Sequence, residues 1–319
     1  MTTVPTSASW RPRSVATLVA LVACLAFVRC GGTSTPTSPS PQVPTPPVSP
    51  QPVPPVVPSP PQTFVGAGDI GWCGSPGVAL TARLLDAISG TVFTTGDNAY
   101  MTGTAEEFRT CYEPSWGRHK ARTRPVPGNH EYEGAGPGPY FDYFGGAAGP
   151  YGLGYYSFEL GDWHVIALNT MLDLREGSAQ TQWLRNDLIV SKSKCTVAYW
   201  HYPLFTSRPA GNSGTLRPIW KILMDFGVDV VLNGHDHLYE RFAPQDENGL
   251  LSTATGIREF IVGTGGAPAY PFGPTTANSE RRITNVFGVL KLTLSSGSYD
   301  WQFIQDSGAV SDSGSGTCH

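Results

Sequence analysis

Hydrophobic residues follow two spacings between residue 64 and the C-terminus, and each spacing predicts one kind of element. Short apolar runs rich in β-branched and aromatic side chains predict strands at residues 64–70, 91–95, 196–200 and 228–232. Apolar residues three or four positions apart predict helices at residues 78–88, 178–188 and 216–226. Two further apolar segments flank Gly161-Asp162, which predicts a hairpin of residues 155–160 and 163–168.

The order of these elements indicates the fold class. A β-α-β pattern comes first, strands dominate the middle, and residues 260–262 and 289–303 are again typical of strands. Thr104 and Glu107 have the spacing of a capping box, which predicts the start of a short helix. The pattern predicts an α/β domain of mixed sheets flanked by helices.

The N-terminal segment has the composition of a targeting sequence. Two arginines precede an apolar run at residues 15–28, which is shorter than the ~20 residues of a membrane-spanning helix and typical of a signal peptide. The four residues LVAC that end at Cys24 resemble a bacterial lipobox, in which Cys24 would carry the lipid. Cys30 is the alternative lipid-bearing residue. The segment could also be a plain signal peptide that is cleaved without lipidation. We therefore expect residues 1–30 to be a signal peptide or lipoprotein anchor.

The next segment, residues 31–62, holds thirteen of the 29 prolines and no charged side chain. This composition predicts a Pro-rich disordered linker that favours polyproline II, a stiff spacer of ~3.1 Å per residue. The linker would either tether an anchor to a catalytic domain at residues 63–319 or simply follow a cleaved signal peptide. We expect an exported protein that is anchored in a membrane and faces the periplasm or cell exterior, or that is secreted.

Composition and charge narrow the classes of partner. The chain has 319 residues, of which 40% are hydrophobic and 14% charged, so the part after the linker can bury a sizeable core. The formal net charge of −4 argues against a general nucleic-acid or membrane-surface binder, and no nucleic-acid partner is expected.

Five short segments combine the end of a strand with side chains that bind metal ions. They are Gly68-Asp69-Ile70-Gly71, Gly96-Asp97-Asn98-Ala99-Tyr100, Gly128-Asn129-His130-Glu131, Tyr199-Trp200-His201 and Gly234-His235-Asp236-His237. Four of them carry a glycine, which is expected to let the backbone turn sharply. Taken singly, each segment is more often a turn, a cap or an ordinary histidine, but the five together indicate a metal centre. Carboxylate and imidazole ligands suit Fe, Zn or Mn, and two metals ~3.5–4 Å apart can supply what phosphate-ester hydrolysis needs.

Four cysteines lie outside the N-terminal segment: Cys73, Cys111, Cys195 and Cys318. An even number in an exported protein predicts two disulfides, although four cysteines allow three pairings. We expect Cys73–Cys111, since both lie just beyond strand ends that bear candidate ligands, and Cys195–Cys318, which would hold the C-terminus to the strand before His201. A zinc site is the alternative, but no two of these cysteines have C-x-x-C spacing.

The five segments resemble the signature of calcineurin-like metallophosphoesterases, and specifically of the purple acid phosphatase branch. In the wider superfamily a histidine follows the first aspartate by two residues, whereas Gly71 stands at that position here. The branch with this glycine uses a tyrosine, and Tyr100 has the required spacing from Asp97. The similarity extends from about residue 64 to the C-terminus. It implies a four-layer α/β/β/α sandwich of two mixed β-sheets.

The resemblance also implies two overlapping sets of metal ligands. An Fe(III) ion would be held by Asp69, Asp97, Tyr100 and His237. A second ion, Zn, Fe or Mn, would be held by Asp97, Asn129, His201 and His235, so that Asp97 bridges the two.

The residues expected to meet the substrate are fewer. His130 is similar to the family's histidine that contacts the phosphate or protonates the leaving group, with Glu131 steadying it; the alternative is that His130 is only a structural neighbour of Asn129. Plant members have two adjacent histidines after the fourth segment, where this chain offers only Arg208 and Asn212.

The implied activity is hydrolysis of phosphate monoesters by a metal-bound hydroxide, as in an acid phosphatase. One alternative is hydrolysis of phosphodiesters or nucleotides at the same centre. Another is a cell-surface binding protein that keeps the fold without activity, although all seven ligand positions are filled. The expected partners are a small phosphate ester and, through the lipid anchor, the membrane.

Overall fold

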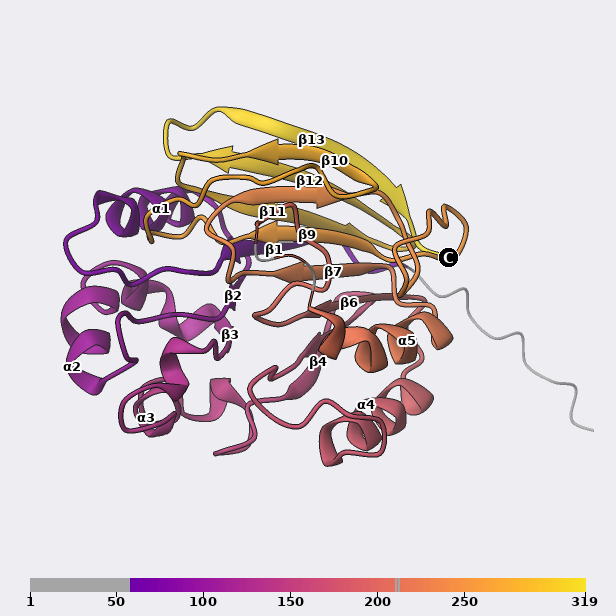
Figure 1. Ribbon diagram of the computed structural model, residues 1–319, viewed down its shortest axis with the longest axis horizontal. Helices are drawn as coiled ribbons and strands as arrows, with labels where there is room; N and C mark the ends of the chain where they lie inside the picture. The colour runs from indigo at the N-terminus through magenta and orange to yellow at the C-terminus, as the bar shows by residue number, and fades with distance from the viewer. Residues whose placement is uncertain (1–57, 210, 212) are drawn as a thin grey trace, which may run out of the picture. The chain divides into compact units, whose positions relative to one another are not determined.

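Two β-sheets lie face to face in the computed structural model, which describes residues 58–209, 211 and 213–319 (Figure 1). The predicted signal sequence with Cys24 and Cys30, most of the predicted linker, and Asn212 lie outside the described residues. The account below therefore begins at residue 58.

The first sheet has six strands in the order β13-β12-β11-β1-β2-β3. Its strands are β1 (Gln62–Ala67), β2 (Thr91–Thr95), β3 (Thr123–Val126), β11 (Gly288–Ser295), β12 (Ser298–Gln305) and β13 (Val310–Thr317). The strands β1, β2 and β3 run parallel, whereas β1, β11, β12 and β13 pair antiparallel. This mixed sheet places the ends of three parallel strands along one edge.

The second sheet has seven strands in the order β10-β8-β9-β7-β6-β5-β4. Its strands are β4 (Tyr156–Leu160), β5 (Trp163–Ala167), β6 (Cys195–Tyr199), β7 (Val230–Asn233), β8 (Tyr239–Phe242), β9 (Arg258–Val262) and β10 (Ser279–Ile283). The central strands β5, β6, β7 and β9 are parallel, and the flanking strands pair antiparallel.

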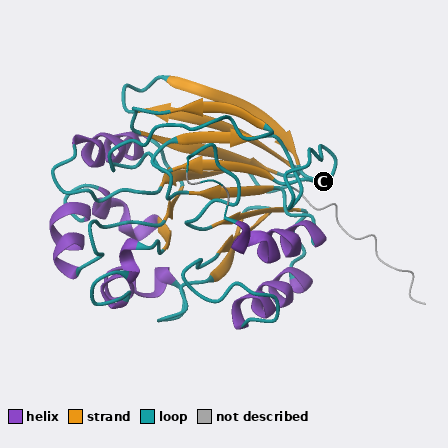
Figure 2. Ribbon diagram, in the orientation of Figure 1, coloured by secondary structure: helices purple, strands orange, loops and turns teal. Residues whose placement is uncertain are grey.

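Helices form two groups, one for each sheet (Figure 2). The first group is α1 (Pro76–Ala87), α2 (Ala105–Glu107) and α3 (Gly138–Phe144), and the second is α4 (Ala179–Val190) and α5 (Arg217–Asp225). Shorter 3₁₀ or π turns occur at Phe108–Tyr112, Trp116–Arg122, His130–Tyr132, Gly145–Ala148 and Gly214–Leu216. Apolar residues of α4 and α5 share one core cluster with residues of β5, β6 and β7. The expected four-layer α/β/β/α sandwich of two mixed sheets is therefore confirmed.

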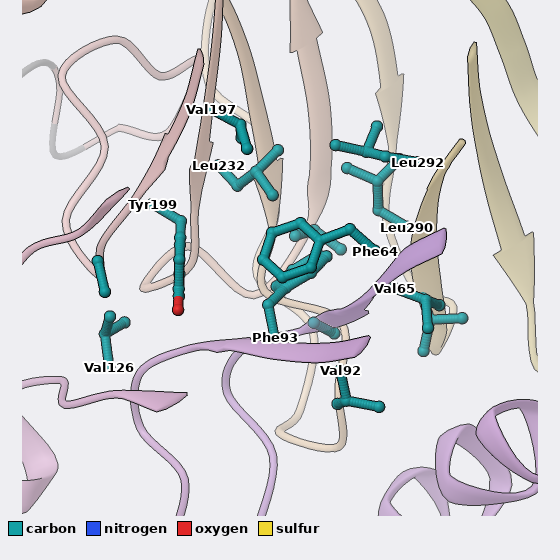
Figure 3. Close-up of a cluster of buried hydrophobic side chains, with 14 of the residues drawn as sticks. Phe64, Val65, Val92, Phe93, Val126, Val197, Tyr199, Leu232, Leu290 and Leu292 are labelled. Atoms are coloured by element: carbon teal, nitrogen blue, oxygen red, sulfur yellow. The ribbon is translucent and has the colours of Figure 1, made fainter. Parts of the chain in front are cut away.

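The core between the sheets is built from aromatic and branched side chains on alternate positions (Figure 3). Phe64 of β1 lies 4.8 Å from Phe93 of β2 and 5.6 Å from Tyr199 of β6, measured between ring centroids. Val65 and Val92 point away from these rings, to the other face of the first sheet (Figure 3). Burying each such side chain contributes roughly 1.5–3 kcal/mol, so this layer fixes the spacing of the two sheets.

The hydrophobic pattern missed four strands, β3, β8, β10 and β13, because none of them contains a run of three apolar residues. Strands β3, β10 and β13 are the outermost of their sheets, and β10 and β13 are largely exposed. Pro125 lies within β3, at an edge where a missing N–H is tolerated. The strands predicted to run to Ile70 and Trp200 are wrong in their ends, because β1 and β6 stop at Ala67 and Tyr199 and the chain then turns.

Both disulfides join the cysteines in the predicted pairs. Cys73–Cys111 links the loop after β1 to the turn at Phe108–Tyr112, with the two Cα atoms 4.9 Å apart. Cys195–Cys318 links the start of β6 to the C-terminus. Two disulfides are compatible with an exported protein. Over the residues that the structure describes, no helix has the length and apolar character needed to cross a membrane.

His164 of β5 lies between two carboxylates, and this arrangement makes the stability depend on pH. Its Nδ1 lies 2.7 Å from Glu159 Oε1 and its Nε2 lies 2.7 Å from Asp187 Oδ2. Only the protonated ring can donate from both nitrogens. Burial lowers the pKa of His164, but the bonds to Asp187 and Glu159 outweigh it, and the pKa is raised.

We expect His164→Gln to lower the free energy of unfolding by about 2 kcal/mol near pH 6, because charged hydrogen bonds are lost. The pKa of His164 is higher in the folded than in the unfolded protein. The extra stability of the wild type is therefore fully present at pH values below the unfolded-state pKa of the histidine, and it is lost as the pH rises through the folded-state pKa. Urea denaturation at about pH 6 and about pH 9 measures this difference. His119→Gln is the control, because burial lowers the pKa of His119 and its pH dependence has the opposite sign. A His164 effect of equal size at both pH values would contradict the prediction.

Candidate metal centre

All seven predicted ligands lie at the ends of parallel strands in the two facing sheets. Asp69 follows β1, Asp97 and Tyr100 follow β2, and Asn129 follows β3. His201 follows β6, and His235 and His237 follow β7. The first sheet thus supplies the oxygen donors, and the second sheet supplies the imidazoles.

The backbone at this edge is strained. Among the described residues, five that are not glycine have φ in the left-handed region, and three are predicted ligands: Asp69 (φ 59°), Asp97 (φ 50°) and His235 (φ 66°). The other two are asparagines, which tolerate this conformation. Such a conformation costs on the order of 1–3 kcal/mol and persists where the surroundings enforce it, most often at functional sites.

The glycines of the five segments serve two purposes, only one of which was expected. Gly96 has φ 91° and turns the backbone as predicted. At Gly128 and Gly234 the reason is instead close packing. A Cβ on Gly128 would lie 2.2 Å from Asp97 Oδ1, and one on Gly234 would lie 2.7 Å from Asp69 Oδ2.

The other three donors of the first predicted set converge on the Tyr100 hydroxyl. That oxygen lies 2.9 Å from Asp69 Oδ1, 3.1 Å from Asp97 Oδ2 and 3.1 Å from His237 Nε2. His237 Nδ1 lies 2.8 Å from the Pro268 carbonyl, so Nδ1 donates there and Nε2 presents its lone pair. A phenol has one hydrogen and cannot donate to three acceptors. Converging lone pairs from oxygen and imidazole are the donor set that a cation such as Fe(III) fits.

The second predicted set converges in the same way. Asn129 Oδ1 lies 3.0 Å from His201 Nε2 and 3.1 Å from His235 Nδ1, and these two ring nitrogens are 3.3 Å apart. His201 Nδ1 lies 2.8 Å from the Thr95 carbonyl, which leaves Nε2 facing the cluster. Asp97 Oδ2 is 3.2 Å from His201 Nε2 and also belongs to the first set. Asp97 therefore contacts side chains of both predicted sets.

The charges of this cluster are coupled through Asp97. Burial raises the pKa of Asp97, but the His201 imidazolium outweighs it and lowers that pKa to about 2. Burial lowers the pKa of His201, whereas Asp97 raises it to about 9. Burial and His201 together lower the pKa of His235 to about 3. Burial and the carboxylates of Asp69 and Asp97 raise the pKa of Tyr100 well above its ordinary range, and a bound cation would reverse that direction.

His130 lies at the open side of the cluster. Its side chain is 18% exposed, and its Nε2 is 3.7 Å from Asp97 Oδ2. Its Nδ1 lies 2.6 Å from the Met101 carbonyl, which holds the ring. His130 therefore stands where a substrate on the cluster could reach it.

Glu131 has a different contact from the one expected. Its carboxylate was expected to steady His130, but it accepts hydrogen bonds from four backbone N–H groups. These belong to Asp97 (3.0 Å), Asn98 (2.6 Å), Ala99 (3.1 Å) and Gly128 (2.7 Å). Burial and Asp97 raise the pKa of Glu131, and the bonds from Gly128 and Ala99 oppose that rise. Glu131 thus fixes the loop that carries Asp97, and nothing in its local sequence indicates this.

A second loop beside the cluster is held by buried carboxylates that the sequence analysis did not identify. Asp236 accepts from the Thr206 hydroxyl at 2.5 Å, Glu240 accepts from Ser207 N at 2.8 Å, and Glu259 accepts from Leu204 N at 3.0 Å. Of these three carboxylates, only Asp236 could have been singled out from the sequence, because it lies between two predicted histidine ligands. These bonds order residues 204–208 next to His201.

Arg208, expected near the substrate, stands at the end of this loop. Its Nη1 donates to Asp236 Oδ1 at 2.9 Å, and its guanidinium lies 4.1 Å from the centre of the Tyr270 ring. That ring stacks on His237 with 3.9 Å between centroids. The structure thus places Arg208 beside the cluster.

The sequence model of calcineurin-like phosphoesterases matches residues 62–239, more than half of the chain and all seven predicted ligands. The chain belongs to the calcineurin-like phosphoesterase family. Among its curated relatives, this phosphoesterase is 29% identical over 177 residues to purple acid phosphatase 15 of Arabidopsis thaliana, covering 45% of this chain and 33% of that protein. It is 36% identical over 118 residues to purple acid phosphatase 22 of the same plant, covering 35% and 27%. The chain thus spans a third or less of the length of these relatives.

Solved structures show the same fold. A purple acid phosphatase from yellow lupin (Lupinus luteus) seeds superposes with a TM-score of 0.68 at 23% identity, covering 81% of this chain and 54% of that one. GAP50, the anchor in the inner membrane complex of Plasmodium, superposes with a TM-score of 0.64 at 15% identity, covering 81% and 89%. At these identities the likeness establishes the sandwich alone.

We expect Glu131→Gln to lower the free energy of unfolding of this phosphoesterase by about 2–4 kcal/mol, because an amide N–H₂ would face two buried backbone donors. Urea denaturation measures the loss. Glu106→Gln is the matched control, since the Glu106 side chain is 66% exposed and pairs only with a surface arginine. If both variants are equally stable, the hydrogen bonds from the four N–H groups to the Glu131 carboxylate do not contribute to the stability of the fold.

Proposed function

We propose that this protein hydrolyses phosphate monoesters at a centre of two metal ions, Fe(III) with Zn, Fe or Mn, in the manner of an acid phosphatase. The observation that supports it most is the convergence of seven donor side chains from five strand ends, with Asp97 in contact with members of both predicted sets. When bound, the two ions would neutralise phosphoryl charge and supply an activated water.

The residues of the chain take separate roles in this proposal. Asp69, Asp97, Tyr100 and His237 hold Fe(III), and Asp97, Asn129, His201 and His235 hold the second ion. His130, at the open side, contacts the phosphoryl group or gives a proton to the leaving group. Its Nδ1 contact with the Met101 carbonyl leaves Nε2 as the atom that faces substrate. The expected Cys24 anchor would keep the enzyme on a membrane outside the cytoplasm.

Phosphodiester hydrolysis and an inactive binding protein are the alternative functions. Both are compatible with the same fold, so an activity assay has to distinguish them. Hydrolysis of 4-nitrophenyl phosphate in preference to bis(4-nitrophenyl) phosphate supports the proposal, and the reverse preference indicates a phosphodiesterase on the same centre. One relative is named a probable inactive purple acid phosphatase. Metal-loaded protein that cleaves neither compound would place this chain with such proteins.

Asp97→Asn should lower bound metal and turnover of 4-nitrophenyl phosphate together, each by at least about tenfold, because both ions depend on one carboxylate. Metal content by elemental analysis and the rate are measured on the same sample. Asp173→Asn is the control, since the Asp173 side chain is 47% exposed and pairs with Arg175 at the surface. Normal metal content with full activity in Asp97→Asn would exclude the two-metal centre.

Tyr100 gives the proposal a spectroscopic test. A phenolate bound to Fe(III) absorbs visible light by charge transfer, so iron-loaded protein should be pink to purple, and Tyr100→Phe should lose the band. Tyr202→Phe is the matched control, because the Tyr202 ring packs 4.3 Å from the His235 ring without belonging to the ligand set. Colourless wild-type protein, or a band that survives in Tyr100→Phe, would show that Tyr100 is not a ligand.

A further inference from the structure

A pocket of about 310 Å³ opens beside Tyr100. It is lined by Trp72, Cys73, Tyr100, Met101 and Glu107. The Trp72 and Tyr100 rings lie 5.1 Å apart, and the Met101 side chain is 49% exposed. No residue that lines it carries a positive charge. The pocket therefore presents two aromatic rings and a thioether, and it has nothing that would bind a second phosphate.

The walls of this pocket are fixed by several independent contacts. The loops after β1 and β2 pair at Gly71 and Ala99, which sets Trp72 opposite Tyr100. The Cys73–Cys111 disulfide holds the first loop. The pocket is thus formed before any ligand arrives.

Glu107 holds the second loop in place. Its carboxylate accepts from the backbone N–H of Met101, from Thr102 N at 3.1 Å and from Thr104 N at 2.8 Å. Because these donors occupy the carboxylate oxygens, Glu107 holds the wall of the pocket in place.

The pocket adjoins the place where a leaving group would depart. The His130 ring lies 4.5 Å from the Tyr100 ring, and its Nδ1 contacts the carbonyl of Met101, a pocket residue. The residue expected to protonate the leaving group is therefore in direct contact with two residues that line the pocket, Tyr100 and Met101. The volume suits one or two aromatic rings, and the Trp72 and Met101 side chains favour a planar aromatic partner.

We propose that Trp72 and Met101 bind the leaving group of the substrate and select phosphate monoesters whose ester oxygen is carried by an aromatic ring. This inference rests on the proposed phosphomonoesterase activity and assigns its substrate class. The aromatic ring would lie against Trp72 and under the Met101 thioether while the phosphoryl group sits on the cluster at Asp97.

Binding of phosphonates tests the pocket without turnover. Calorimetry on the full chain loaded with Fe(III) and Zn(II) gives the ratio of affinities for phenylphosphonate and methylphosphonate. We expect a wild-type preference for phenylphosphonate that falls about tenfold in Trp72→Ala and is largely kept in Trp72→Phe. Met101→Ala should lower it about threefold. Leu250→Ala, at an exposed apolar site outside the pocket, should leave the ratio unchanged.

The same variants are then assayed on phenyl phosphate and ethyl phosphate. A fall in the ratio of kcat/KM that parallels the binding ratio supports the inference. No aryl preference in the wild type, or an unchanged ratio in both alanine variants, overturns it even if esters are hydrolysed. If the phosphonate ratios behave as expected while no ester is cleaved, the proposed hydrolysis fails and the aryl-binding pocket stands.

Discussion

The buried carboxylate of Asp97 is the group on which the candidate metal centre and its surroundings depend. Its side chain is 1% exposed, and it meets Tyr100, His201 and the backbone N–H of His130. A buried charge is costly unless it is paired and hydrogen-bonded. Asp69 brings a second carboxylate with 0% exposure to the same place. Two buried carboxylates beside a tyrosine hydroxyl give this region a demand for positive charge, which imidazoles meet in part and metal ions would meet fully.

The distance between the two halves of the site is set by the packing of the two sheets. The oxygen donors follow the parallel strands of one sheet, and the histidines follow the parallel strands of the other. Packed sheets lie roughly 10 Å apart, so the rings of Phe64, Phe93 and Tyr199 set the distance that the ligand loops must bridge. The strained φ of Asp69, Asp97 and His235 is the local cost of turning side chains into that gap. The stability of the core therefore supports the geometry of the centre.

The sequence predicted the central strands and the ligand positions because both are local patterns. Strands β1, β2, β6 and β7 are mostly buried and appear as continuous apolar runs, and each ligand lies within a few residues of a strand end. Strand β13 could not be predicted in this way, since its exposed residues alternate among serine, glycine and aspartate. The contact of Glu131 with the backbone of Asp97 spans 34 residues and depends on how β2 and β3 align. Such through-space contacts have no signal in a single sequence.

One local pattern has a consequence that its sequence does not indicate. Thr104 and Glu107 form the capping box predicted for α2, and both of its hydrogen bonds are present. The same Glu107 carboxylate also binds the backbone of Met101 and Thr102, in the loop that begins at Tyr100. A motif that usually only starts a helix thereby ties a predicted metal ligand to the neighbouring pocket wall. Because Tyr100 belongs to both, this loop couples the position of one predicted ligand to the shape of the pocket.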